Sequence, residues 1–259
     1  MSIIEALFLG VIQGLTEFLP ISSSGHLMLM QGLLGMQNLR GLMLFDLVCH
    51  LGTLGALFVY FRDNIKHLFA EHGRLFFLIC LGTLPLFFIV PFKSWVDKAF
   101  ETPTWLWLAF LTTGIILYFG EYFGRDKGDD IRPLQAFSVG AAQAFAVIPG
   151  ISRSGTTISA SRIVGIPRRK AVVFSFLLAI PAILGGTVLE AAHIFFKPHA
   201  VVAANVGLLQ YAVGFIFSFI AGIASLGVVM RIVLNDALKY FAWYCFAISA
   251  FCLFYFVIL

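Results

Sequence analysis

The sequence contains few charged residues, and this scarcity sets its broad class. Asp, Glu, Lys and Arg make up 12% of the 259 residues, whereas 60% are hydrophobic and 29 are Phe. A soluble core of this size has no place for so many apolar side chains, so the composition predicts a polytopic membrane protein. The excess of basic over acidic residues is only four, and the sequence has no stretch in which aromatic and basic residues alternate. We therefore expect no nucleic-acid partner.

Paired cysteines and a leader segment are missing too. No C-x-x-C pair occurs, and single cysteines in apolar runs are expected to be small buried residues rather than disulfide or metal partners. They are Cys49, Cys80, Cys245 and Cys252. The segment from Met1 to Glu5 lacks the basic leader and cleavage site of a signal peptide, so we expect the first helix to remain in the mature protein.

Long apolar runs, by contrast, fill most of the chain. A helix needs about 20 residues to cross a bilayer. Six runs reach this length, and each predicts one transmembrane helix: about 42–61, 74–92, 104–123, 171–195, 208–230 and 239–259.

Two further runs are interrupted by a proline. They are 3–19 and 24–35 around Pro20, and 134–148 and 155–165 around Pro149. The returning halves, eleven or twelve residues long, are too short to cross a bilayer. Each pair therefore predicts a re-entrant hairpin whose non-helical tip is buried in protein.

At a shift of 130 residues, with no gap, the chain matches itself at positions that include the following eight identical pairs. The pairs are Gly10 and Gly140, Gln13 and Gln143, Ile21 and Ile151, Ser22 and Ser152, Ser24 and Ser154, Gly25 and Gly155, Gly35 and Gly165, and Gly55 and Gly185. Each half holds one hairpin and three transmembrane spans. Because three is an odd number of crossings, the second half enters the membrane from the opposite face. We predict a single all-α membrane domain over 1–259, an inverted-topology repeat of about 1–125 and 131–259, with both tips near the midplane.

Basic residues lie mostly on one side of this topology. Twelve fall opposite the N-terminus: Arg62, Lys66, Arg74, Arg125, Lys127, Arg132, Arg162, Arg168, Arg169, Lys170, Arg231 and Lys239. Four fall on its own side: Arg40, Lys93, Lys98 and Lys197. Because cytoplasmic loops carry the basic excess, we predict both termini outside the cytoplasm.

The second break contains an arginine, which is expensive in lipid. An Arg at membrane depth costs about 2.5 to more than 10 kcal/mol, so a partner, water or an anionic ligand must offset it. The planar guanidinium of Arg153 suits phosphate oxygens, and the Ser and Thr hydroxyls add hydrogen-bond donors. Gly150 and Gly155 let backbone N–H groups come close to an anion. A phosphate is the expected ligand.

The first break carries the acid and the imidazole. Gln13 and Glu17 are four residues apart, so they share a helix face that points at the break, and His26 follows Ser24 and Gly25. Burying the Glu17 carboxylate at membrane depth is costly, so its presence predicts a functional role for Glu17. Because a half-helix begins at each tip, two helix N-termini would also attract an anion.

These residues resemble the two signature regions of the undecaprenyl-diphosphate phosphatase family of the bacitracin-resistance type. Its members are integral membrane enzymes of the bacterial inner membrane that regenerate the lipid carrier for cell-wall polymers. The likeness runs through nearly the whole chain and is most specific from Gln13 to His26 and from Pro149 to Thr157. It implies hydrolysis of undecaprenyl diphosphate, with Glu17, His26 and Arg153 essential.

The resemblance also implies a requirement for Mg²⁺ or Ca²⁺. Many members have Glu where this chain has Gln13, which puts a two-carboxylate metal site in question and leaves Glu17 able to work with a single cation or with water alone. Asp46 sits where the family tends to place an acid and could supply the second charge. A salt-bridged or interfacial Asp46 is the alternative.

Mechanistically, the arginine and the hydroxyls would hold the diphosphate while the prenyl chain stays in lipid. The attacking group stays open between His26, Ser23 and water, with Glu17 orienting it or holding the cation. The candidate catalytic residues are Glu17, His26, Arg153 and Ser23. The candidate substrate-binding residues are Gln13, Ser22, Ser24, Ser152, Ser154, Gly155, Thr156 and Thr157.

Two other acid and histidine pairs receive little weight. Asp46 and His50 are four apart, and Glu190 and His193 are three apart, but neither has the further ligands of a zinc site. We expect both pairs near the outer interface.

Two function classes remain beside the hydrolase. A transporter or flippase is the main alternative, because inverted repeats with broken helices are a transporter architecture. The lipid phosphatases with Ser-Gly-His, Ser-Arg and a later His-x-x-x-Asp share Ser24-Gly25-His26, but the later pair is missing. The expected partners are a polyprenyl diphosphate and the bilayer, with a site open to the outer side and a homodimer left open.

Overall fold

The computed structural model describes residues 1–36, 39–70, 73–100, 102–128, 130–196, 206–233 and 238–258. Within these ranges every regular element is helical, so the all-α prediction is confirmed. Lys197, counted above among the outer charges, and Leu259, the end of the last predicted span, lie outside the described residues.

The prediction of six membrane-crossing segments is also confirmed by length and composition. Six stretches of the described chain are long and apolar enough to cross a membrane: Leu42–Tyr60, Arg74–Phe100, Pro103–Phe123, Arg168–Ala192, Leu208–Val233 and Leu238–Ile258. Their outer surfaces are apolar, with side chains such as Phe88 and Leu208 exposed to 73% and 87%. Such a surface suits contact with lipid.

The two interrupted runs form four short helices. They are α1 (Ile3–Phe18), α2 (Ser23–Leu33), α8 (Pro133–Phe145) and α9 (Arg153–Ile163). Leu19, which precedes Pro20, is extended, as the steric demand of a following proline favours, so α1 ends there. The hydroxyl oxygens of Ser22 and Ser152 cap α2 and α9 by accepting hydrogen bonds from the N–H groups three residues later, at 3.2 and 3.0 Å.

The other helices make up the rest of the bundle. They are α3 (Leu39–Tyr60), α4 (Arg62–Ala70), α5 (Arg74–Phe87), α6 (Lys93–Phe100), α7 (Leu106–Phe123), α10 (Arg168–Phe196), α11 (Leu208–Val233) and α12 (Leu238–Leu253), with 3₁₀ turns η1 (Val90–Phe92) and η2 (Pro103–Trp105) and a π-helical end η4 (Phe254–Ile258). The predicted helix over 74–92 is therefore not continuous. Pro85 removes a backbone donor near its end, and α5 stops two residues later.

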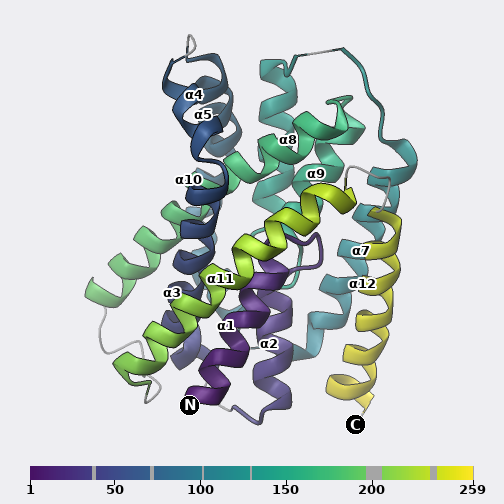
Figure 1. The fold of residues 1–259 in the computed structure, drawn as a ribbon. Coiled ribbons are helices and arrows are strands. Elements are labelled where there is room, and N and C mark those ends of the chain that lie inside the picture. The colour runs from purple at the N-terminus through teal and green to yellow at the C-terminus, as the bar shows by residue number, and fades with distance from the viewer. Residues whose placement is uncertain are drawn as a thin grey trace.

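The helices are arranged so that the broken pairs occupy opposite ends. Figure 1 places α1, α2 and both chain termini in the lower half of the view, and α8 and α9 in the upper half. α1 packs on α11, and α8 packs on α5. A Cβ on Gly10 would lie 2.7 Å from the Gly214 carbonyl oxygen, and one on Gly140 would lie 2.1 Å from that of Gly82, so both crossings need glycine.

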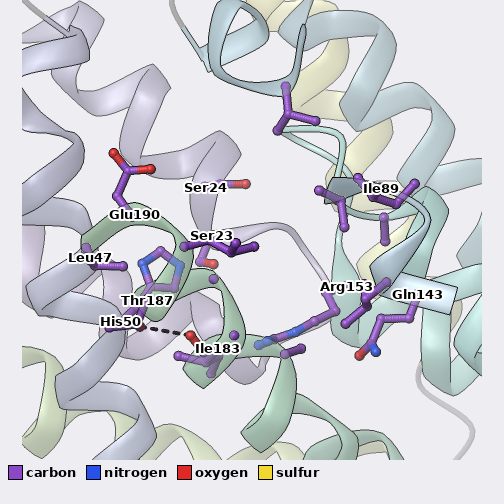
Figure 2. Close-up of a pocket in the computed structure, with 18 of the residues that line it drawn as sticks. Ser23, Ser24, Leu47, His50, Ile89, Gln143, Arg153, Ile183, Thr187 and Glu190 are labelled. Atoms are coloured by element: carbon purple, nitrogen blue, oxygen red, sulfur yellow. Dashed lines mark hydrogen bonds between the residues drawn. The ribbon is translucent and has the colours of Figure 1, made fainter. Parts of the chain in front are cut away.

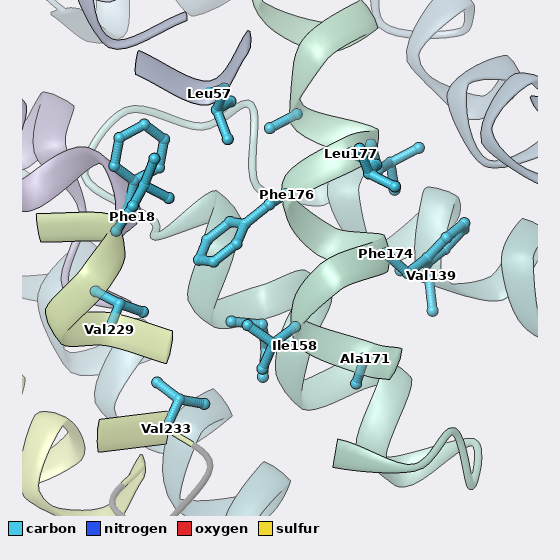
Figure 3. Packing of buried hydrophobic residues seen from close by; sticks show 14 of the residues in the cluster. Phe18, Leu57, Val139, Ile158, Ala171, Phe174, Phe176, Leu177, Val229 and Val233 are labelled. Atoms are coloured by element: carbon cyan, nitrogen blue, oxygen red, sulfur yellow. The ribbon is translucent and has the colours of Figure 1, made fainter. Parts of the chain in front are cut away.

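The main core lies between the broken helices and α10, around Phe18, Phe174 and Phe176 (Figure 3). The rings of Phe18 and Phe176 meet edge to face with centroids 5.8 Å apart. Because Phe18 directly follows Glu17, this packing fixes the end of α1 beside the first break. Of the four free cysteines, Cys80 is exposed, which corrects the expectation that all are buried.

Candidate active site

The two breaks contact one another inside the molecule. We call residues 19–24 the first tip and residues 146–154 the second tip, so that each includes the first residues of the returning helix. The hydroxyl of Ser154 donates to the carbonyl oxygen of Leu19 at 3.1 Å, and the backbone N–H of Gly150 donates to the Ser24 hydroxyl at 3.2 Å. A Cβ on Gly25 would lie 3.1 Å from the Gly150 Cα, so the absence of a side chain there lets the backbones approach.

Glu17 lies in the last turn of α1 and is 5% exposed. One oxygen, Oε2, accepts hydrogen bonds from Gln13 Nε2 at 2.8 Å and from the Ser23 hydroxyl at 2.5 Å. The other, Oε1, accepts from the Arg153 guanidinium. His50 Nε2 lies 3.5 Å from Oε2. A carboxylate this buried needs such donors, since an unpaired charge in a dry interior is costly.

Arg153 is the first residue of α9 and links the second tip to the first. Its side chain is 22% exposed and pairs with the buried Glu17 carboxylate. A second guanidinium nitrogen lies 3.5 Å from the Ala179 carbonyl oxygen of α10. The ion pair therefore joins two segments 136 residues apart, in an environment where removing one partner typically costs about 3 to 5 kcal/mol.

A pocket of about 420 Å³ opens beside this ion pair. Its polar wall contains Glu17, Arg153 and nearby serines. The rest combines apolar side chains, among them those of α3, α5, α6 and α10, with the charged side chains of Lys93, Asp97 and Glu190. Figure 2 shows His50, Thr187 and Glu190 on one side of the view and Arg153 and Gln143 on the other. The lining thus combines polar groups at the two tips with many apolar side chains.

The pocket collects some of the predicted site residues and omits others. Those that line it are Glu17, Ser22, Ser23, Ser24, Asp46, Ser152, Arg153 and Ser154. Those that are not among its described lining residues are Gln13, His26, Gly155, Thr156 and Thr157. Gln13 still acts on the pocket, because its amide donates to Glu17.

His26 lies behind the first tip. Its Nδ1 is 2.7 Å from the Ser22 carbonyl oxygen, and its Nε2 is 2.8 Å from the Tyr244 hydroxyl. The ring stacks on Tyr244 and meets Phe110 edge to face. In this position the imidazole holds the first tip against α7 and α12, and its predicted catalytic role stays a prediction.

Thr156 and Thr157 differ in their surroundings. The Thr157 hydroxyl shares a 2.5 Å hydrogen bond with Ser175 on α10, so it ties α9 to its neighbour. The Thr156 hydroxyl is buried and has no partner among the described residues. Neither hydroxyl reaches the pocket in this arrangement, so a direct contact with substrate stays a prediction for both.

His50 and Asp46 both line the pocket, and His50 approaches Glu17. This places Asp46 near Glu17, where a second charge was one of its two predicted roles, whereas no site role was predicted for His50. The Asp46 carboxylate accepts a hydrogen bond from Gln31 Nε2 at 2.8 Å. The signal in the sequence was their spacing of one helical turn, but nothing local indicated that α3 packs beside α1. Of the other pair, Glu190 also lines the pocket, and the His193 side chain lies outside the described part.

A lysine completes the charged lining. Lys93 Nζ lies 2.8 Å from Asp97 Oδ2 and 2.8 Å from Glu190 Oε2, so it bridges α6 and α10. Sequence reasoning assigned Lys93 to an outer loop and missed its place in the pocket. Both cationic groups of the pocket are thus paired with carboxylates.

The carboxylates of the pocket are already paired in this arrangement and do not form a site for a divalent cation. Ca²⁺ takes six to eight oxygen ligands, and Mg²⁺ takes six, usually one or two carboxylates together with waters or substrate phosphates. Both oxygens of Glu17 already accept hydrogen bonds, and Asp46 is bonded to Gln31. Within the described chain, no group of three His, Cys, Asp or Glu side chains is placed to hold a metal.

Comparison with known proteins gives one family throughout. A family model described as bacitracin resistance protein BacA matches residues 6–251. The undecaprenyl-diphosphatase of Protochlamydia amoebophila is 48% identical over 250 residues, covering 96% of each chain. Those of Carboxydothermus hydrogenoformans and Syntrophotalea carbinolica are 40% and 39% identical, covering 94% and 95% of each chain.

Proposed function

Because the chain belongs to the family described as bacitracin resistance protein BacA, we propose that it hydrolyses undecaprenyl diphosphate to undecaprenyl phosphate and inorganic phosphate. The product would be the lipid carrier used again in cell-wall synthesis. The observation that carries the proposal is the Glu17 and Arg153 ion pair at the polar wall of a pocket with apolar sides. Such a pocket suits a charged headgroup on a hydrocarbon chain.

Arg153 and the serines of the tips would bind the diphosphate. A phosphate that enters the pocket competes with Glu17 for the guanidinium, which can bind two phosphate oxygens at once. The hydroxyls of Ser23, Ser24 and Ser154 lie in the lining of the same pocket. The Ser23 and Ser154 hydroxyls donate to Glu17 and Leu19, so each would turn from that partner to donate to a phosphate. Charge developing on the phosphoryl oxygens would then be stabilised by the guanidinium and these hydroxyls, the usual source of catalysis in phosphoryl transfer.

Glu17 would act as the residue that positions the others. The Gln13 amide, the Ser23 hydroxyl and the Arg153 guanidinium all donate to its carboxylate. Convergence of these donors holds the serine and the arginine at fixed places on the pocket wall. His26, whose ring holds the first tip through Ser22, would preserve the same geometry from behind.

We also propose that the chain is an inverted repeat with two re-entrant hairpins. The proposal is supported by the bounds of two helices: the residue numbers of α9 equal those of α2 plus 130 at both ends. Each of the two helices is also capped by a serine at the matching position. Gly35 and Gly165, at the ends of these helices, both have positive φ, at 69° and 91°. The opposite placement of the two pairs in Figure 1 agrees with it.

In the bacterial inner membrane, both termini would face away from the cytoplasm, and the pocket would open to the outer side. This orientation rests on the basic residues counted above and on the termini lying at one end of the molecule (Figure 1). Labelling of a single cysteine introduced at either terminus in intact cells tests it. The monomeric or homodimeric state is measured in detergent by light scattering.

A cation that supports turnover would arrive on the diphosphate rather than on the protein. The carboxylates of the pocket are already hydrogen-bonded, and diphosphate oxygens bind Mg²⁺ or Ca²⁺ well. A cation held by the free protein would raise its unfolding temperature. We therefore expect the same unfolding temperature for the free protein with Mg²⁺ and with EDTA.

The decisive experiment is phosphate release from undecaprenyl diphosphate by the purified protein in detergent. Hydrolysis predicts release of one phosphate per lipid without any second membrane compartment. A transporter or flippase would leave the diphosphate intact under these conditions. No release by a folded wild-type protein would therefore overturn the proposed function.

A further inference from the structure

The imidazole of His50 faces the ion pair from α3. Its Nδ1 lies 2.7 Å from the carbonyl oxygen of Asp46, one turn earlier on the same helix. A carbonyl oxygen can only accept, so Nδ1 carries a hydrogen, and the orientation of the ring is fixed. The opposite nitrogen, Nε2, is then the one 3.5 Å from Glu17 Oε2. It is the nitrogen of a ring that is 26% exposed and lines the pocket.

His50 and His26 are the two histidines whose side chains the structure describes, and they are not equivalent. His26 is 6% exposed, and each of its nitrogens is within 2.8 Å of a partner, Ser22 or Tyr244. His50 keeps one nitrogen anchored and presents the other to the cavity. Of these two rings, His50 alone is in a position to meet a molecule in the pocket.

The other ionisable side chains of the pocket are already engaged. Arg153 pairs with Glu17, and Lys93 pairs with Asp97 and Glu190. Asp46 accepts from the Gln31 amide. The charged or titratable groups that line the cavity with His50 are Glu17, Asp46, Lys93, Asp97, Arg153 and Glu190. His50 Nε2, 3.5 Å from Glu17 Oε2, lies beside the cavity where a water molecule could reach it.

We propose that His50 is a catalytic residue that moves the proton during hydrolysis. The proposal rests on the proposed function of the pocket. A water molecule attacks the terminal phosphorus, its oxygen bonds to that phosphorus, and one of its protons goes to His50 Nε2. The bond from the terminal phosphorus to the bridging oxygen breaks, and its electron pair stays on the lipid monophosphate. The imidazolium, stabilised by the Glu17 carboxylate, then returns the proton to that oxygen.

Two substitutions test this step. His50→Gln keeps a polar side chain but cannot carry the proton, so kcat is expected to fall about 100-fold or more while KM changes less than about threefold. If His50→Gln unfolds in detergent, His50→Asn replaces it, because its amide N–H₂ can still donate to the Asp46 carbonyl. A loss confined to KM, or a normal kcat in the folded variant, would overturn the proposal.

Chemical rescue separates a proton carrier from a structural residue. His50→Ala leaves space beside the 420 Å³ cavity, so imidazole added to the buffer is expected to restore kcat at least about tenfold. His26→Ala is the matched control, because its ring lies outside the pocket and added imidazole should not restore turnover there. Rescue of His26→Ala without rescue of His50→Ala would assign the proton to His26 and refute the inference.

The assay of the wild-type protein distinguishes failure of the proposed function from failure of the proposed role of His50. If the wild-type protein releases no phosphate, the proposed function itself has failed. If the wild type is active and the folded His50 variants match it, only the role of His50 has failed.

Discussion

At the first tip the charged residue, Glu17, comes from the helix before the break, whereas at the second tip Arg153 begins the helix after it. The shift of 130 residues aligns Glu17 with Val147 and Arg153 with Ser23. Each half thus contributes one charge and leaves the matching position of the other half neutral. In the proposed repeat the two halves therefore share the same helix order at the break but divide the charged residues, so neither half can balance its charge alone.

Removing either charge should have the largest effect. Glu17→Gln and Arg153→Gln are each expected to lower turnover at least about 10³-fold, because a donor or the residue that positions it is lost. Each should also destabilise the fold by about 3 kcal/mol, since a buried charge is left unpaired. Phosphate release and unfolding of the purified variants measure both quantities.

The double variant decides whether the two charges act as one unit. With neither charge present, most of the lost stability should return while turnover stays low. Stability losses that simply add in the double variant would show that each residue is held by other contacts, and the comparison of the tips would fail.

The glycine crossings of the two halves should give the next largest effect. Gly10→Ala and Gly140→Ala push a methyl group against the backbones of Gly214 and Gly82, so each is expected to cost about 1 to 3 kcal/mol, with Gly140→Ala the worse. Gly185→Ala, a helical site with nothing within 4 Å of the added Cβ, is the control and should be neutral or stabilising. Equal unfolding temperatures for all three would contradict close packing at the crossings.

The paired glutamines should respond in opposite directions. Gln13 donates to the buried Glu17, whereas neither amide atom of Gln143 has a partner among the described residues, because its neighbour one turn on is Val147. Gln13→Leu is expected to destabilise by about 1 to 2 kcal/mol, and Gln143→Leu to be neutral or stabilising. Urea or thermal unfolding compares them, and equal losses at both positions would mean that Gln143 has a polar partner in the folded protein.

The capping serines should give the smallest difference. Ser22 has φ of 71°, unusual for a residue with a side chain, whereas Ser152 has φ of −70°. Glycine replaces a capping serine at a cost of a few tenths of a kcal/mol, but at position 22 it also relieves about 1 kcal/mol of backbone strain. Ser22→Gly is therefore expected to be more stable than Ser152→Gly. A lower unfolding temperature for Ser22→Gly than for Ser152→Gly would refute strain at Ser22.

Much of the fold followed from local pattern. Apolar length predicted the six spans, and Pro20 and Pro149 marked the breaks. The helices resume at Ser23 and Arg153, one and two residues before the predicted starts at 24 and 155. These features depend on a few neighbouring residues, so they can be read without tertiary contacts. The break of the 74–92 run after Pro85 was missed, because a proline near a helix end can be tolerated or can stop the helix.

The composition of the pocket could be predicted only in part. Glu17, Arg153 and the tip serines stood out because polar residues are expensive in an apolar chain. His26 was predicted to be catalytic, yet it lies behind the first tip and outside the pocket lining. His50 and Lys93, for which no catalytic role was predicted, line the pocket. Which face of α3 and α6 turns inward depends on packing against α1 and α10, which no local pattern specifies.

The sequence by itself determined a helical membrane chain with two proline breaks, each carrying polar groups that lipid cannot solvate. The tertiary structure decided which of those groups meet. Partners 136 residues apart along the chain, such as Glu17 and Arg153, come together only when the helices that carry them pack. That packing also turns one imidazole towards the cavity and the other away, because each ring follows the helix that bears it.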